Sequence, residues 1–263
     1  MARMTIGAAI GRILRRCTLI AVLVAGWELA ARLHMTTDFL LPAFSTVMHR
    51  LALDIASGQL PMALAYTLYR ALAGFALAGA AGVVIGILIA RVPWARWFFD
   101  PLVSVGLPMP KIAFLPIFVL WFGVFDESKI LMVAFSAVFP VIVEATAATE
   151  SVDRVLIWSA LGLGAGEQSL LWEIALPAAV PQIMTGLQVA LPISLIVAVL
   201  AEMQMGGEGL GASMMQSFRF ADSPGVFAGI IAIAVAGSVL VKAMEIIRRR
   251  LLVWHTDAEA GAG

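Results

Sequence analysis

Lysines and glycines are the residues from which a phosphate-binding loop is built, and this sequence does not combine them in that way. Such a loop needs a glycine directly before its lysine. Lys111, Lys129 and Lys242 all lack one. The stretch Gly207–Gly211 is rich in glycine, but it lacks the GxGxxG spacing and no strand is predicted before it. We therefore expect this chain to bind no nucleotide cofactor.

Metal-ligating and catalytic side chains are equally scattered. His34, His49 and His255 form no HExxH motif and have no cysteine pair beside them, because Cys17 is the single cysteine. No combination of nucleophile, base and orienting residue is apparent. The sequence predicts no disulfide and no metal or catalytic site, and we expect a protein that is not an enzyme.

Lys111 is the charge best placed to act on a solute, because it lies in an apolar stretch that also contains Pro101, Pro108, Pro110 and Pro116. A charge at the centre of a transmembrane helix costs about 2.5–3.5 kcal/mol, so such charges face protein or water. One hypothesis places Lys111, Pro110 and Pro116 on a translocation path that favours an anionic solute. The alternative is a structural ammonium that satisfies backbone carbonyls freed by the prolines.

Arg70 is a second charge in apolar surroundings, directly before an uncharged run from 71 to 90. A long arginine side chain can reach the membrane surface while its stem remains among apolar groups. We expect Arg70 either to do this or to pair with an acidic side chain, rather than to bind a solute.

The composition indicates an integral membrane protein. Hydrophobic residues make up 62% of the chain and charged residues 13%, against roughly 45–50% and 25% in soluble domains. The mean hydropathy is +0.99. Basic and acidic residues balance at 17 each, which gives no indication of a nucleic-acid partner.

The length and the apolar runs predict about six transmembrane helices. For the first run a cleaved signal peptide is the alternative, but Trp27 and Glu28 stand where small cleavage-site residues belong. An amphipathic helix over 45–56, with Val47, Leu51 and Ile55 on one face, is predicted at the outer interface. The predicted spans are 17–33, 66–90, 101–122, 130–149, 183–201 and 225–244.

The distribution of basic residues predicts that both termini are cytoplasmic. Three basic residues, Arg50, Lys129 and Arg219, fall in the predicted outer segments. Ten fall in the predicted cytoplasmic segments, in agreement with the positive-inside rule. These ten are Arg3, Arg12, Arg15, Arg16, Arg91, Arg96, Arg154, Arg248, Arg249 and Arg250.

The segment 151–181 is the longest charged interruption between predicted spans on the cytoplasmic side. Its spacing predicts a short helix over 152–161, a break at three glycines between 162 and 166, and a second short helix over 167–175. Pro177 and Pro181 are expected to turn the chain back toward the membrane. Apolar residues in a water-exposed segment favour a docking surface; the alternative is a re-entrant loop packed on its own subunit.

The same segment resembles the EAA loop of the inner-membrane subunits of ABC importers. Gly164 is followed, after nine residues, by Ile174-Ala175-Leu176-Pro177, as in that family. Trp158-Ser159-Ala160 stands where the family has Glu-Ala-Ala. The resemblance implies that the loop docks on a cytoplasmic ATPase subunit. The residues assigned to this contact are Trp158, Ser159, Ala160, Leu161, Gly162, Gly164, Ile174, Leu176 and Pro177.

Further motifs extend the resemblance over roughly 40–254 and narrow it to nitrate, sulfonate and taurine permeases. They include Thr67-Leu68-x-Arg70 before Gly74-Phe75, and the proline-rich stretch 107–116 followed by Leu120-Trp121-Phe122-Gly123. Ala201-Glu202 followed by Gly209-Leu210-Gly211 is similar to another family signature. The implied fold is the all-α type I ABC importer permease fold, with a transport domain over 62–250. Residues 1–61 hold the N-terminal tail, first span and interfacial segment, and 251–263 form a cytoplasmic tail.

The resemblance also implies the partners and the mechanism. The expected partners are two cytoplasmic ATPase subunits, a second permease subunit in a homodimer, an external substrate-binding protein and the lipid bilayer. ATP and magnesium would bind to the ATPase, and a small polar or anionic solute would cross a bacterial inner membrane by alternating access. The alternatives are a membrane scaffold, a carrier without an ATPase, and a membrane-embedded enzyme.

Overall fold

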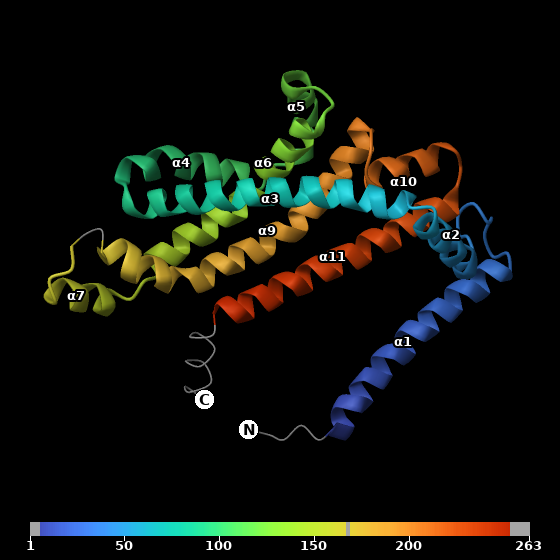
Figure 1. Ribbon diagram of the computed structural model, residues 1–263, viewed down its shortest axis with the longest axis horizontal. Helices are drawn as coiled ribbons and strands as arrows, with labels where there is room; N and C mark the ends of the chain where they lie inside the picture. Colours follow the sequence, from blue (N-terminus) through green and yellow to red (C-terminus); the bar gives the residue numbers. More distant parts are fainter. Residues whose placement is uncertain (1–5, 167–168, 253–263) are drawn as a thin grey trace.

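The computed structural model describes residues 6–166 and 169–252, and every regular element in these ranges is helical (Figure 1). The all-α fold is thus confirmed for this part of the chain. η1 is a 3₁₀ helix and η2 a π-helix. In chain order the elements are α1 (Ile6–Arg32), α2 (Phe44–Ala56), α3 (Gln59–Arg91), α4 (Pro93–Gly106), η1 (Lys111–Phe114), α5 (Leu115–Phe122), α6 (Asp126–Glu150), α7 (Arg154–Gly162), η2 (Leu170–Ala175), α9 (Leu176–Met205), α10 (Leu210–Arg219) and α11 (Ser223–Leu251).

Four helical runs among the described residues are long and apolar enough to cross a membrane: α3, α6, α11 and the run Trp172–Met205, which contains α9. A fifth crossing results if α4 and the η1–α5 segment, bent by 101°, form one span. These cover five of the six predicted spans. α1 is not among them, because charged residues at both of its ends leave a charge-free stretch of only 17–27.

The core of the bundle is the contact of α3 with α6 and of α6 with α9, which run side by side through the molecule (Figure 1). The glycines of α3 make this contact close, because the absence of a Cβ atom lets two helices approach each other. A Cβ atom at Gly82 would lie 2.7 Å from Val141 Cβ, and one at Gly86 would lie 2.6 Å from Ala145 Cβ. On α9, a Cβ at Gly186 would lie 2.7 Å from Glu144 Cβ. Larger side chains would force these helices apart.

The third predicted span is broken, but its boundaries differ from the prediction. α4 already begins at Pro93, eight residues before the expected start at 101, because proline is well accommodated in the first helical turn. Pro101 lies inside α4 and is tolerated there. The break lies between Gly106 and η1, directly before Lys111.

α1 and α2 join the bundle at the end opposite α7 (Figure 1). Trp27 Nε1 of α1 donates a hydrogen bond to the Pro42 carbonyl at 2.9 Å, and the Glu28 carboxylate accepts from Ser45. Arg50 of α2 pairs with Asp222, beside the start of α11, at 2.6 Å. The predicted amphipathic helix is therefore present as α2, with Val47 as its buried residue.

Replacing Gly82 with leucine is expected to destabilise the bundle by about 1–3 kcal/mol. The new side chain would overlap Val141 of α6, whose Cβ lies 2.7 Å from the position of the added Cβ. Thermal unfolding of the detergent-solubilised protein measures this effect. Gly26→Leu is the matched control, since a Cβ at Gly26 has no atom within 4 Å. Equal unfolding temperatures for the two variants would contradict the close-contact interpretation.

Candidate functional site

The first half of the 151–181 segment is α7, which projects from one end of the bundle (Figure 1). The helix begins at Arg154 because Asp153 caps it: Asp153 Oδ1 accepts a hydrogen bond from the Val155 backbone N–H at 2.8 Å. The chain leaves the helix through Gly164, whose φ of +87° is a left-handed conformation that favours glycine. The predicted helix over 152–161 therefore exists, shifted by one or two residues.

The surface of α7 and its neighbouring turn is apolar and uncovered. Trp158 is 65% exposed and Leu163 is 89% exposed. Of the residues assigned to the ATPase contact, Ser159, Gly162 and Gly164 are exposed as well, whereas Ala160 is buried. The exposed large apolar side chains of this segment, here called the α7 patch, are Val155, Leu156, Trp158, Leu161, Leu163 and Trp172. A patch of this kind marks an interaction site for protein or membrane.

The second half of the segment differs from the prediction. Residues 167–168 lie outside the described ranges, and η2 over Leu170–Ala175 is a π-helix that continues directly into α9. The prediction that Pro177 and Pro181 turn the chain back is wrong. Pro177 lies in the first turn of α9, where its missing N–H is not needed, and Pro181 lies inside that helix.

The α7 patch is connected to the bundle from both sides. On one side α6 ends at Glu150, and Ser151 Oγ lies 3.2 Å from Gln182 Oε1 of α9. On the other side Leu176 packs against the cluster that contains Ala145 and Ala148 of α6. Ile174 and Leu176 are half-buried and Pro177 is exposed. A force on α7 would therefore act on α6 and α9 together.

Lys111 lies in η1, at the break between α4 and α5. Its Nζ donates a hydrogen bond to the Leu107 carbonyl at 2.5 Å and lies 5.2 Å from the centre of the Phe139 ring. The Leu107 carbonyl belongs to the interrupted helix, so this contact agrees with the structural alternative for Lys111. The side chain is also half-exposed, and Pro110 and the exposed Pro116 lie on either side of η1.

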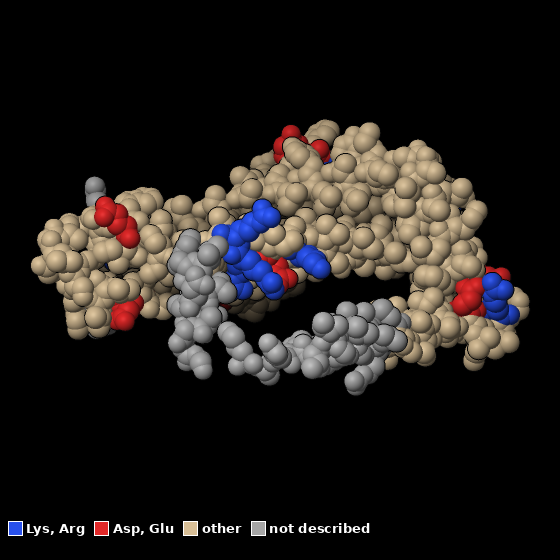
Figure 2. Space-filling model, turned by 60° about the horizontal axis from the view of Figure 1, so that its bottom comes forward, with Lys and Arg blue, Asp and Glu red and all other residues tan. Residues whose placement is uncertain are grey.

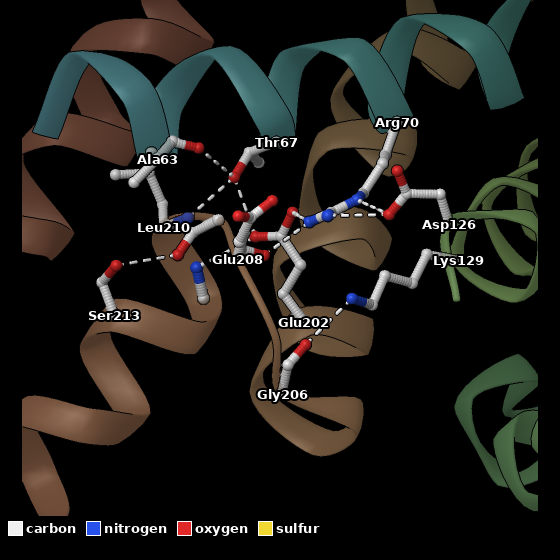
Figure 3. Close-up of polar contacts among 12 residues, drawn as sticks. Ala63, Thr67, Arg70, Asp126, Lys129, Glu202, Gly206, Glu208, Leu210 and Ser213 are labelled. Carbon is white, nitrogen blue, oxygen red and sulfur yellow. Dashed lines mark hydrogen bonds and ion pairs between the residues drawn. The ribbon is translucent and has the colours of Figure 1, made fainter. Parts of the chain in front are cut away.

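Arg70 of α3 lies in a buried polar cluster with Asp126 at the start of α6 and Glu202 near the end of α9 (Figure 3). Because α7 follows the other end of α6, the cluster lies at the end of the bundle away from α7. Its guanidinium pairs with Glu202 at 2.6 Å and with Asp126 at 2.8 Å, and it donates to the Glu208 carbonyl at 2.5 Å. Arg70 is 2% exposed and Glu202 is fully buried. The expected pairing of Arg70 with an acid is confirmed.

Glu202 is a residue that the sequence reasoning did not assign to a site. Its carboxylate accepts hydrogen bonds from Thr67 Oγ1 at 2.8 Å and from the Gly211 backbone N–H at 3.0 Å. A Cβ at Gly209 or Gly211 would collide with the Glu202 side chain. The spacing of Ala201-Glu202 and Gly209-Leu210-Gly211 was the available signal, and its physical basis is a glycine turn folded over a buried carboxylate.

Lys129 completes the cluster. Its Nζ donates to the Gly206 carbonyl at 2.9 Å, so Arg70 and Lys129 both hold the backbone of the 206–209 turn (Figure 3). Within the described ranges no buried polar side-chain atom lacks a hydrogen-bond partner, and no group of His, Cys, Asp and Glu is arranged to hold a metal. The cluster therefore fastens α3, α6, α9 and α10 together.

Glu202→Gln is expected to lower the stability by about 3–5 kcal/mol, because it removes the charge that compensates a buried guanidinium. Asp126→Asn is the matched control. It removes the other partner of Arg70, but Asp126 is 43% exposed, so solvent offsets most of the loss. Thermal unfolding in detergent compares the stabilities of the variants. A loss of stability for Asp126→Asn as large as that for Glu202→Gln would contradict a larger contribution of the buried Arg70–Glu202 pair than of the Arg70–Asp126 pair.

Comparison with known proteins identifies the family. Residues 82–253, more than half of the chain, match the family of binding-protein-dependent transport system inner membrane components. The taurine transport system permease protein TauC of Escherichia coli K12 is 33% identical over 246 residues, covering 91% of this chain and 89% of TauC. SsuC of Bacillus subtilis 168, named for aliphatic sulfonate transport, is 33% identical over 239 residues, covering 91% and 87%.

The fold has a counterpart among solved structures. The MetNI methionine ABC transporter in an inward-facing conformation superposes with a TM-score of 0.66 over 75% of this chain and 98% of the matched chain, at 15% identity. At that identity the likeness shows the fold, which is that of type I ABC importer permeases. The resemblance predicted from the loop and proline motifs is thus confirmed: the chain belongs to the family of binding-protein-dependent transport system inner membrane components, as a transport permease subunit rather than an enzyme.

Proposed function

We propose that this chain forms the translocation path of an ATP-driven importer and receives the driving motion through α7. The observation that carries the proposal is the α7 patch: an uncovered apolar surface on a short helix that connects α6 to η2 and α9. Uncovered tryptophan and leucine side chains on a segment outside the predicted spans favour a protein partner. The family's ATPase is the partner that this surface fits.

The transmission follows from the packing. Motion of α7 acts on α6 through the turn at 151–153 and on α9 through η2. Because α3, α6 and α9 touch at glycine positions, they respond as one body rather than bending separately. We infer that this body alternates between inward- and outward-open arrangements, driven by differential binding of the ATPase in its two states.

The partners and the location complete the proposal. ATP and magnesium bind to two cytoplasmic ATPase subunits, since this sequence has no phosphate-binding lysine loop. A second copy of the chain forms the other half of the path, and an external substrate-binding protein delivers the solute. The domain boundaries are 1–61, 62–250 and 251–263. With α1 as a sixth crossing beside the five candidate spans, both termini are on the cytoplasmic side of a bacterial inner membrane.

We further propose a small polar or anionic organic solute. The names of TauC and SsuC assign taurine and aliphatic sulfonates to those relatives. In this chain, Lys111 with Pro110 and Pro116 is the proposed contact on the path, because its side chain is only partly buried and its ammonium makes one hydrogen bond in the described structure, to the Leu107 carbonyl.

Gly164→Leu is expected to uncouple ATP hydrolysis from transport, because a leucine at φ +87° is strained and displaces the end of α7. Uptake into proteoliposomes and ATPase activity are measured on the same assembled complex. The control is Gly166→Leu, in the same turn, where space is open and φ is not in the left-handed region. Normal uptake by the Gly164 variant, with normal coupling, would contradict the role of α7.

Lys111→Met is expected to reduce uptake of an anionic solute by about tenfold while leaving the assembled complex intact, because it removes one charge from the path. Lys111→Arg keeps the charge and is expected to retain most of the uptake. Loss of assembly in the methionine variant would favour the purely structural role, and unchanged uptake together with unchanged assembly would contradict both roles.

A further inference from the structure

A cluster of basic side chains lies on the surface that the last part of α11 forms (Figure 2). Lys242, Arg248, Arg249 and Arg250 all lie between residue 242 and the end of the helix at Leu251. The proposed transport path and the α7 patch make no use of them. They serve a separate binding function, which requires only that α11 spans the bilayer.

The length of α11 sets the depth of these residues. Its 29 residues extend about 44 Å, against about 30 Å for the hydrocarbon core of a bilayer. Lys242 lies about 28 Å from the start of the helix, near the edge of the hydrocarbon. Arg249 and Arg250 lie about 40 Å from the start, at the depth of the lipid headgroups.

The packing of α11 shows which of the four cations face outward. Met244 is buried against Met184 and Leu191 of α9, and Arg248 Nη1 donates to Gln188 Oε1 at 2.9 Å, so this face is turned to the bundle. Lys242 and Arg249 are seven residues apart and lie on the opposite face. Both are exposed, as is Arg250 beside them.

The charges on the outward face are only partly neutralised. Arg249 pairs with Glu245 one turn earlier. Among the described residues, no acidic side chain forms an ion pair with Lys242 or Arg250. Val239 and Val235, one and two turns before Lys242, are 63% and 57% exposed. Cations at headgroup depth beyond uncovered valines at hydrocarbon depth match a lipid, which offers a phosphate above acyl chains, better than they match a water-soluble partner.

We propose that Lys242, Arg249 and Arg250 form a binding surface for the headgroup phosphate of an anionic phospholipid, with its acyl chains against Val235 and Val239, which are exposed at hydrocarbon depth. Lys242 and the two arginines lie at different depths, so the phosphate lies between positive charges. An uncharged or zwitterionic headgroup has no net negative charge and neutralises these cations less well. Glu245 lowers the affinity of this surface, because its carboxylate already occupies Arg249.

The test counts lipids that remain bound to the purified full-length chain, with the subunits it retains, by native mass spectrometry after exposure to equal amounts of phosphatidylglycerol and phosphatidylcholine. The wild type is expected to prefer phosphatidylglycerol. Lys242→Gln with Arg250→Gln is expected to lower this preference about fivefold for each charge removed. Glu245→Gln is expected to raise it, because Arg249 becomes available.

Arg219→Gln is the matched control, since Arg219 is an exposed arginine in the last turn of α10, at the other end of the bundle. It is expected to keep the wild-type preference. An unchanged preference in the double variant, a reduced preference in Glu245→Gln, or an equal loss in Arg219→Gln would each overturn the proposal. ATPase retained in the same samples is recorded separately, so failure of the ATPase contact and failure of lipid binding are distinguishable.

Discussion

The close approach of α3, α6 and α9 is the constraint on which the rest of the structure depends. Lipid chains are as apolar as leucine, so burial of hydrophobic surface alone does not hold transmembrane helices together. Close packing and buried polar contacts must do so. Gly82, Gly86 and Gly186 permit the packing, and the side chains of Val141, Ala145 and Glu144 fill the space that a Cβ atom would need.

The buried polar cluster fixes the end of this helix group that lies away from α7. Arg70 links α3 to α6 and α9, and both Arg70 and Lys129 hold the turn that leads into α10. A buried ion pair contributes little net stability, but losing one partner is costly, so its main effect is to specify one arrangement. The two ends of the bundle thus differ in kind: one is fastened by ion pairs, and the other carries the exposed α7 patch.

Much of the fold could be predicted from the sequence, because a chain in lipid must satisfy its backbone groups within helices. The apolar runs located α3, α6, α9 and α11. Their ends were missed because hydropathy detects only the part inside the hydrocarbon: α3 begins at Gln59 instead of 66, and α11 continues to Leu251 instead of 244. Pro181 predicts a turn in a soluble chain, yet neighbouring helices let α9 continue through it.

The residues of the two sites could be predicted from the sequence only in part. The cap of α7 and its glycine end are local features that the sequence displays directly. The partner of Arg70 was not predictable, because Glu202 lies 132 residues away and meets it only through the packing of α3 on α9. The exposure of Trp158 and the burial of Ala160 likewise depend on how α7 sits on the bundle, which local spacing does not specify.

The central claim is that an ATPase subunit binds this chain through the segment that contains α7. A pull-down from the native host, with the solubilised intact chain and a variant in which residues 151–177 are scrambled, tests this directly. We predict that the intact chain retains an ATPase subunit and an external binding protein, and that the scrambled chain loses the ATPase. A correctly folded intact chain that retains no ATPase even after crosslinking would contradict the account.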